Sequence, residues 1–132
     1  MLPVTTDTIQ GDCPVGGIYL FTEYGKHLYV GRTKQSIKAR VKGHVGTAND
    51  CPFAWHLARE STGFTKASYK TKGSRKQLLG QPEFKQTYES AKIRIRKMEV
   101  RYVAEPDPVK QALLEIYVVV ATGAKYNDFD TH

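Results

Sequence analysis

The sequence predicts a mixed α/β (α+β) fold in which a small three-stranded antiparallel sheet is flanked by helices. Three short segments rich in β-branched and aromatic residues predict the strands. Apolar residues at helical spacing predict the helices. The expected order is strand, strand, three helices, strand, helix, which is typical of a mixed fold with a small sheet. The 132 residues are enough for one domain with its own core.

The first two strands are expected to form a hairpin. Gly16 and Gly17 open a strand that runs through Ile18 to Thr22, and a second strand covers residues 27–31. The turn residues 23–26 between them predict an antiparallel pairing. Residues 99–105 predict the third strand.

The helices are expected from their caps and apolar stripes. Ser36 is a suitable N-cap for a helix whose stripe is Ile37, Val41 and Val45, ending near Gly46. Further helices are predicted over 50–63 and 82–98. The last follows Asp107 and Pro108 and stops at Gly123. Residues 1–15 are interpreted as an N-terminal arm, 64–80 as a basic loop or at best a short helix, and 16–132 as one domain.

The net charge of +7 is unevenly distributed. Residues 34–101 hold sixteen of the twenty basic residues and five of the thirteen acidic ones. This indicates a face suited to a polyanion, with a solubilising surface as the alternative. No apolar run approaches the roughly 18 residues of a membrane span, and no secretory signal is recognised. Cys13 and Cys51 are too few for a disulfide framework or a zinc site, so reduced thiols in a cytoplasmic protein without a membrane partner are expected.

Glu115 is the only charge between Leu113 and Ala121. A helix that is apolar nearly all round is expected to be buried on most faces. A buried carboxylate is costly unless it is paired or bound to a metal. The alternatives are a solvated stripe of the helix or a salt bridge to an arginine at the edge of the core.

Two further pairs need an explanation. Arg40 and His44 lie four residues apart, at the border of the predicted core stripe, from where they can reach a cleft. Tyr19 and Tyr29 lie on paired strands with glycines close by. A solvated helix face explains the first pair equally well, and cross-strand packing the second.

Together these residues resemble the GIY-YIG nuclease family. Gly17-Ile18-Tyr19 matches its first element, and Tyr29-Val30-Gly31 matches the second with valine in place of isoleucine. Arg40, His44, a late-helix glutamate (Glu115) and a following asparagine (Asn127) complete six elements in order. The stretch from Val45 to Met98 is particular to this chain, and its basic residues match no family positions. No extra target-selecting domain is recognised.

The resemblance implies a single-domain GIY-YIG-like fold and a divalent-metal-dependent DNA endonuclease that hydrolyses phosphodiester bonds and keeps the phosphate on the 5′ side. Glu115 would hold one Mg²⁺ or Mn²⁺ ion, and Arg40 would contact the phosphate. Tyr19 is the family-based candidate for the general base, with Tyr29 and His44 left as alternatives. Gly31 and Asn127 would order the site. The expected DNA contacts bordering it are Arg32, Lys34, Lys38 and Lys42, and further basic residues are Lys70, Lys72, Arg75, Lys76, Arg94, Arg96 and Lys97.

Two other functions stay open. The first is a nucleic-acid-binding module of the same fold without activity. The second is a protein-interaction domain whose charge is incidental.

Overall fold

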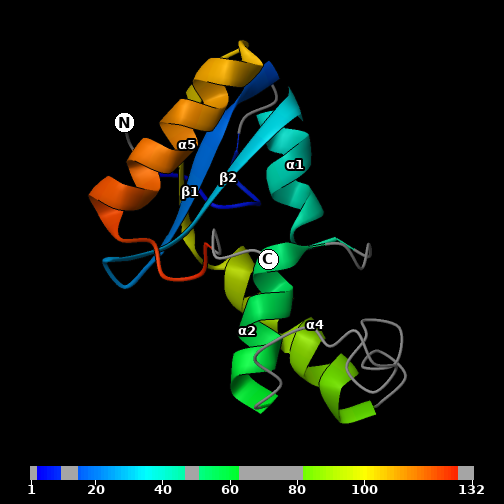
Figure 1. Cartoon of the computed structure of the whole chain (residues 1–132). Coiled ribbons are helices and arrows are strands. Elements are labelled where there is room, and N and C mark those ends of the chain that lie inside the picture. Colours follow the sequence, from blue (N-terminus) through cyan, green and yellow to red (C-terminus); the bar gives the residue numbers. More distant parts are fainter. Residues whose placement is uncertain (1–2, 10–14, 47–50, 63–81, 128–132) are drawn as a thin grey trace, which may run out of the picture.

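The computed structural model of the chain describes residues 3–9, 15–46, 51–62 and 82–127. Its centre is a three-stranded antiparallel sheet in the order β2-β1-β3, formed by Val15–Glu23 (β1), Lys26–Ser36 (β2) and Glu99–Ala104 (β3). Helices flank this sheet, so the predicted fold class is confirmed (Figure 1).

The hairpin turn explains the pairing of β1 with β2. Tyr24 and Gly25 both have positive φ angles, 51° and 77°, as a two-residue hairpin turn with the right twist requires. Glu23 then pairs with Lys26. Strand β2 runs to Ser36, five residues beyond the predicted end, because Thr33 still pairs with Gly17 and is buried there.

The described helices are α1 (Ile37–Gly43), α2 (Pro52–Thr62), α4 (Pro82–Arg96) and α5 (Pro108–Thr122), each at a position that the sequence predicts. The expected loop or short helix over 64–80 lies outside the described residues. The Ser36 side chain caps α1 by accepting a hydrogen bond from the Ala39 amide. Asp107 caps α5 in the same way. Helix α1 ends at Gly43, three residues before the predicted end.

The core lies between β1, β2 and the helices α1 and α2, and continues between α2 and α4. There the Trp55 ring contacts the rings of Phe84 and Tyr88 with centroids 5.4 and 4.8 Å apart. In Figure 1, α2 and α4 lie side by side below the sheet. The described part of the N-terminal arm belongs to this structure, because Val4 bridges to Val100 and Ile9 is buried.

The expectation that α5 is buried on most faces is wrong. Five of its large apolar side chains are at least half exposed: Val109, Leu113, Ile116, Tyr117 and Val120. Only Gln111 is buried in this helix. The physical reason is that α5 contacts β1 and β2 of a narrow sheet, and no described element covers its outer side (Figure 1).

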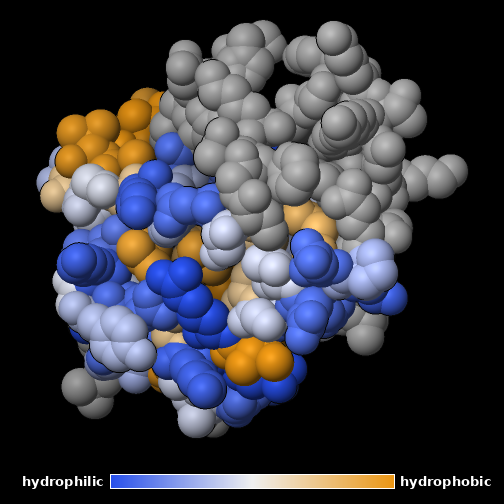
Figure 2. Space-filling view, turned by 90° about the horizontal axis from the view of Figure 1, so that it is seen from below, coloured by the Kyte–Doolittle hydropathy of each residue, from blue (hydrophilic) through white to orange (hydrophobic). Residues whose placement is uncertain are grey.

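Seen from below, the coloured surface is mostly hydrophilic, and several hydrophobic patches interrupt it, the largest at the upper left (Figure 2). None of the helices within the described ranges has the length and apolar character needed to cross a bilayer.

Candidate active site

The two strands of the hairpin bring both motif tyrosines to one side of the sheet. Tyr19 pairs with Gly31, and Phe21 pairs with Tyr29. Directly paired residues share a face, so Tyr19, Tyr29 and Gly31 lie on the same one. A Cβ atom at Gly31 would overlap the phenol ring of Tyr19. A glycine is therefore required there for the Tyr19 ring to lie flat across β2.

His44 lies between the two tyrosines and is 0% exposed, although the sequence predicts a border position. It is the C-cap of α1, and its side chain turns inward. The Nε2 atom lies 2.7 Å from the Tyr19 hydroxyl, and Nδ1 lies 2.7 Å from Sγ of Cys51. The imidazole also contacts the ring of Tyr29, with centroids 5.7 Å apart. Burial, reinforced by the charge of Arg40, lowers the pKa of His44 to about 3, so the ring is neutral.

Arg40 connects the two tyrosines electrostatically. Burial raises the pKa of Tyr19 far above its usual value and that of Tyr29 to about 12. The positive charge of Arg40 works against both increases, and Arg40 also interacts with the Tyr19 hydroxyl as a hydrogen-bond donor. Arg40 is itself only partly buried, at intermediate exposure. Two phenols and one guanidinium therefore form a compact, partly accessible cluster.

Glu115 approaches this cluster from α5. Its carboxylate lies 3.7 Å from Nε of Arg32, and its side chain is 18% exposed. Burial raises the pKa of Glu115, and the charge of Arg32 opposes that increase. The charge of Glu115 in turn raises the pKa of Tyr29. Glu115 and Tyr29 are thus within electrostatic reach of each other although they come from different elements.

Asn127 holds the outer edge of β2. Its side-chain oxygen accepts a hydrogen bond from the Val30 amide, and its side-chain nitrogen donates to the Val30 carbonyl, both at 2.7 Å. The Tyr126 amide donates to the Leu28 carbonyl at 2.8 Å. The segment after α5 therefore pairs with β2 and fixes the backbone directly beside Tyr29.

The predicted DNA contacts occupy different positions. Lys38 and Lys42 lie on α1, and Lys34 is exposed on β2. Arg32 donates to the Pro108 carbonyl in addition to its ion pair with Glu115, so it is engaged with α5. Arg94 is held by Glu23, while Arg96 and Lys97 are exposed at the end of α4. Lys70, Lys72, Arg75 and Lys76 lie outside the described residues.

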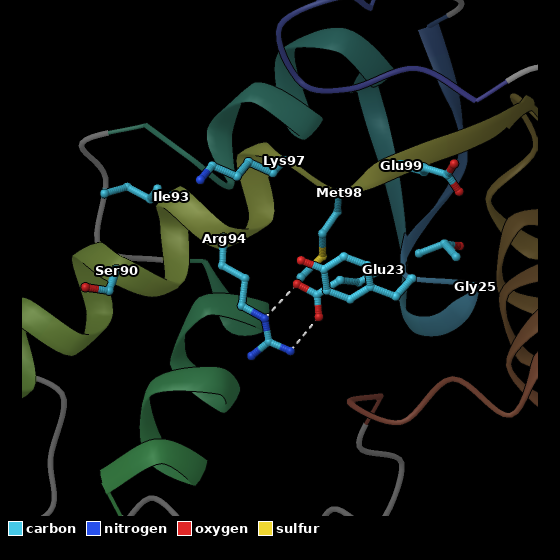
Figure 3. Close-up of a pocket in the computed structure, with 10 residues that line it drawn as sticks. Glu23, Gly25, Ser90, Ile93, Arg94, Lys97, Met98 and Glu99 are labelled. Carbon is cyan, nitrogen blue, oxygen red and sulfur yellow. Dashed lines mark hydrogen bonds and ion pairs between the residues drawn. The ribbon is translucent and has the colours of Figure 1, made fainter.

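A separate cleft of about 480 Å³ lies between the hairpin turn and α4 (Figure 3). The Arg94 guanidinium donates two hydrogen bonds to the Glu23 carboxylate there, at 2.8 and 2.7 Å. Lys97 and Glu99 also line it. None of the six motif elements contributes a side chain to this cleft, so it is distinct from the cluster around Arg40.

The candidate site contains one carboxylate that could bind a metal ion, that of Glu115. Within the described ranges, no three His, Cys, Asp or Glu side chains gather at one point. Burial raises the pKa of Glu115 because it disfavours the charged carboxylate. The 3.7 Å contact with Arg32 offsets only part of that cost. A hard divalent cation often binds through one or two carboxylates, with waters and phosphate oxygens completing its shell. The donor set therefore fits a singly anchored Mg²⁺ or Mn²⁺ ion.

Cys51 is the participant that the sequence did not single out as part of the site. It is 1% exposed and unpaired with another cysteine. Cys13 lies outside the described residues. The available signal was the position of Cys51 directly before Pro52, which begins α2, seven residues after His44. A buried side chain at the start of a helix points into the interior, but its partner cannot be read from spacing alone.

Comparisons with known proteins return no match, whether with family models, curated proteins or solved structures.

Proposed function

We propose that the chain is a DNA endonuclease of the GIY-YIG kind that uses a divalent metal ion to hydrolyse phosphodiester bonds. The observation that carries this proposal is the position of Tyr29, which shares a face of the hairpin with Tyr19, contacts the ring of His44 and lies within electrostatic range of Arg40 and Glu115. A cation, a carboxylate and a proton acceptor, three groups that suit phosphodiester hydrolysis, therefore lie within electrostatic range of one another.

Arg40 is the group that would bind the scissile phosphate. Its planar guanidinium donates two parallel hydrogen bonds to phosphate oxygens, which a lysine cannot do. Negative charge grows on those oxygens as water attacks, so a fixed cation stabilises the transition state more than the ground state. Its partial exposure leaves Arg40 accessible to DNA.

Exposure separates the three candidate proton acceptors. Tyr19 is 1% exposed, and His44 has both ring nitrogens within hydrogen-bonding distance of protein groups. Tyr29 has intermediate exposure and is the candidate that water can approach. In the proposed step the Tyr29 phenolate, the minor form at neutral pH, takes a proton from water as the water oxygen bonds to phosphorus. The bond to the 3′ oxygen breaks, and that oxygen takes a proton from solvent. The pKa of about 12 at Tyr29 predicts a rate that rises with pH through the neutral range.

Glu115 is the residue that would hold the metal ion. When bound, such an ion supplies positive charge to the scissile phosphate and the leaving oxygen. Lys38 and Lys42 on α1, together with Lys34, would add phosphate contacts that are salt-sensitive and independent of sequence.

The test is nicking of a supercoiled plasmid with Mg²⁺, with Mn²⁺ and with a chelator. We expect metal-dependent nicking by the wild type, and a loss of at least about 100-fold in Glu115→Gln. Glu89→Gln is the matched control, because Glu89 is exposed on α4 outside the site. Equal nicking by the wild type and Glu115→Gln would remove Glu115 from the mechanism. DNA binding without nicking would instead support the inactive binding module.

A further inference from the structure

The hydrogen bonds of His44 extend past Tyr19 to Cys51. Both ring nitrogens have a partner at 2.7 Å, the Tyr19 hydroxyl on one side and the Cys51 sulfur on the other. All three residues are at most 1% exposed. A neutral imidazole carries one N–H and one lone pair, so one of these partners must donate a hydrogen bond to the ring and the other must accept one from it.

We propose that Cys51 is a positioning residue that fixes the proton of His44 on Nε2 and thereby leaves the Tyr19 hydroxyl free to donate into the candidate active site. The effect on cleavage rests on the proposed function, whereas the proton position in His44 does not.

The surroundings of Cys51 decide the direction of these hydrogen bonds. The Ala54 amide donates to the Cys51 sulfur at 3.4 Å, and the Phe53 amide also donates to it. These backbone groups can only donate, so the thiol proton must go to another acceptor. The Nδ1 atom of His44 lies within reach. Burial raises the pKa of Cys51 to about 11, so the thiol proton is present at neutral pH.

The hydrogen bond from Cys51 to His44 also determines the direction of the hydrogen bond between His44 and Tyr19. If the thiol donates to Nδ1, the ring proton is on Nε2, and Nε2 donates to the Tyr19 oxygen. Arg40 also donates to that oxygen. The hydroxyl proton of Tyr19 is then turned away from both donors, and Tyr29 on β2 interacts electrostatically with Tyr19. The proton is available for an anionic oxygen, either that of Tyr29 or that of a bound phosphate.

The opposite direction would have a different outcome. If Tyr19 donated to Nε2, its proton would be held in the hydrogen bond to the buried imidazole. The Nδ1–H group would then point at a sulfur that already accepts hydrogen bonds from two amides. The charged or titratable groups around Tyr19 are Tyr29 on β2, Arg40 on α1 and Cys51 beside α2. Of these, Arg40 donates to the Tyr19 oxygen alongside Nε2, and the imidazole links that oxygen to Cys51.

The direct test is nitrogen NMR of the histidine ring in the whole chain, because a protonated ring nitrogen differs strongly in chemical shift from an unprotonated one. In the wild type and in Cys51→Ser, which keeps a donor, we expect the His44 proton on Nε2. In Cys51→Ala, we expect a mixture of the two neutral forms. A wild-type proton on Nδ1, or protons on both nitrogens, would overturn the proposal.

The second test is a double-mutant comparison in the cleavage assay. We expect Cys51→Ala to lower kcat about tenfold with KM unchanged, as the loss of one oriented hydrogen bond implies, and Cys51→Ser to restore it. Added to Tyr19→Phe, Cys51→Ala should cause no further loss, because its effect acts through that hydroxyl. Losses that multiply would contradict the proposal.

Ile95→Val is the control for packing, because Ile95 is fully buried on α4, which carries neither of the hydrogen-bond partners of His44. It should lower the melting temperature without lowering kcat. If the wild-type chain cuts no DNA, the proposed function is wrong, but the NMR experiment still decides where the His44 proton lies. Normal cleavage by Cys51→Ala would end only the role of Cys51.

Discussion

The hydroxyl of Tyr19 lies 2.7 Å from Nε2 of His44, and neither residue is more than 1% exposed. This contact joins the first strand to the end of α1 across the interior. It makes His44 a structural partner of the tyrosine. A base that exchanges protons with solvent needs access that this imidazole lacks.

The first prediction concerns the pH dependence of stability. His44 has a pKa of about 3 when folded and about 6.5 when unfolded, so the unfolded chain binds more protons between these values. Stability is therefore fully present above pH 6.5 and is lost as the pH falls toward 3. The full slope for one proton is about 1.4 kcal/mol per pH unit.

The measurement is the free energy of unfolding by denaturant between pH 5 and 6.5. His44→Gln should show a shallower pH dependence than the wild type, whereas Ile95→Val, which removes no titratable group, should keep the wild-type slope. Parallel curves for His44→Gln and the wild type would mean that His44 titrates normally in the folded chain.

The second prediction concerns Gly31. Gly31→Ala should destabilise the chain by about 1–3 kcal/mol, because the added methyl group must displace the Tyr19 ring. Gly43→Ala is the matched control, since a methyl group added there would meet no neighbouring group within 4 Å and alanine favours the helix. Thermal unfolding of both variants decides the matter. A Gly31→Ala chain as stable as the wild type would show that the Tyr19 ring does not lie across β2.

The third prediction concerns Asn127. Asn127→Asp should lower the free energy of unfolding by about 1–3 kcal/mol, because the carboxylate cannot donate to the Val30 carbonyl and sets a charge against it. Hydrogen exchange of the Val30 amide, which donates to Asn127, should become faster if the segment detaches. Unchanged exchange and stability would mean that this segment does not hold the edge of β2.

Local signals account for most of what the sequence predicted correctly. The caps Ser36 and Asp107 and the turn around Gly25 act within a few residues, so they fix where elements begin and end. The hairpin brings Tyr19 and Tyr29 together without any long-range information. The contact of Cys51 with His44 depends on where the start of α2 lies relative to the end of α1, and the spacing of apolar residues carries no information about that.

The exposure of α5 could not be predicted for a related reason. Apolar residues around a whole helix normally mean burial, but that inference assumes that enough other elements are present to cover it. Here the sheet has three strands, and α5 packs mainly on β2 and β1. The apolar composition of a helix indicates how much surface it can bury. The number of other elements packed against the helix decides how much of that surface is buried.

The fourth prediction follows from that exposure. Leu113→Gln combined with Val120→Gln should change the free energy of unfolding by less than about 1 kcal/mol, because both side chains are mostly exposed, Val120 by 78%. Leu57→Gln is the buried comparison on α2 and should cost several kcal/mol. A loss above about 2 kcal/mol in the α5 variant would mean that the outer side of α5 is covered in solution.

The most direct test of the proposed activity compares the wild type with Arg40→Ala on supercoiled plasmid in Mg²⁺, with DNA affinity measured on the same plasmid by gel shift. We predict that the wild type nicks the plasmid and that Arg40→Ala is at least about 100-fold slower while its affinity stays within a few fold. Lys42→Ala, an exposed change on the same helix, should retain turnover and lose some affinity. Wild-type binding without cleavage, or equal cleavage by Arg40→Ala, would contradict the proposed activity.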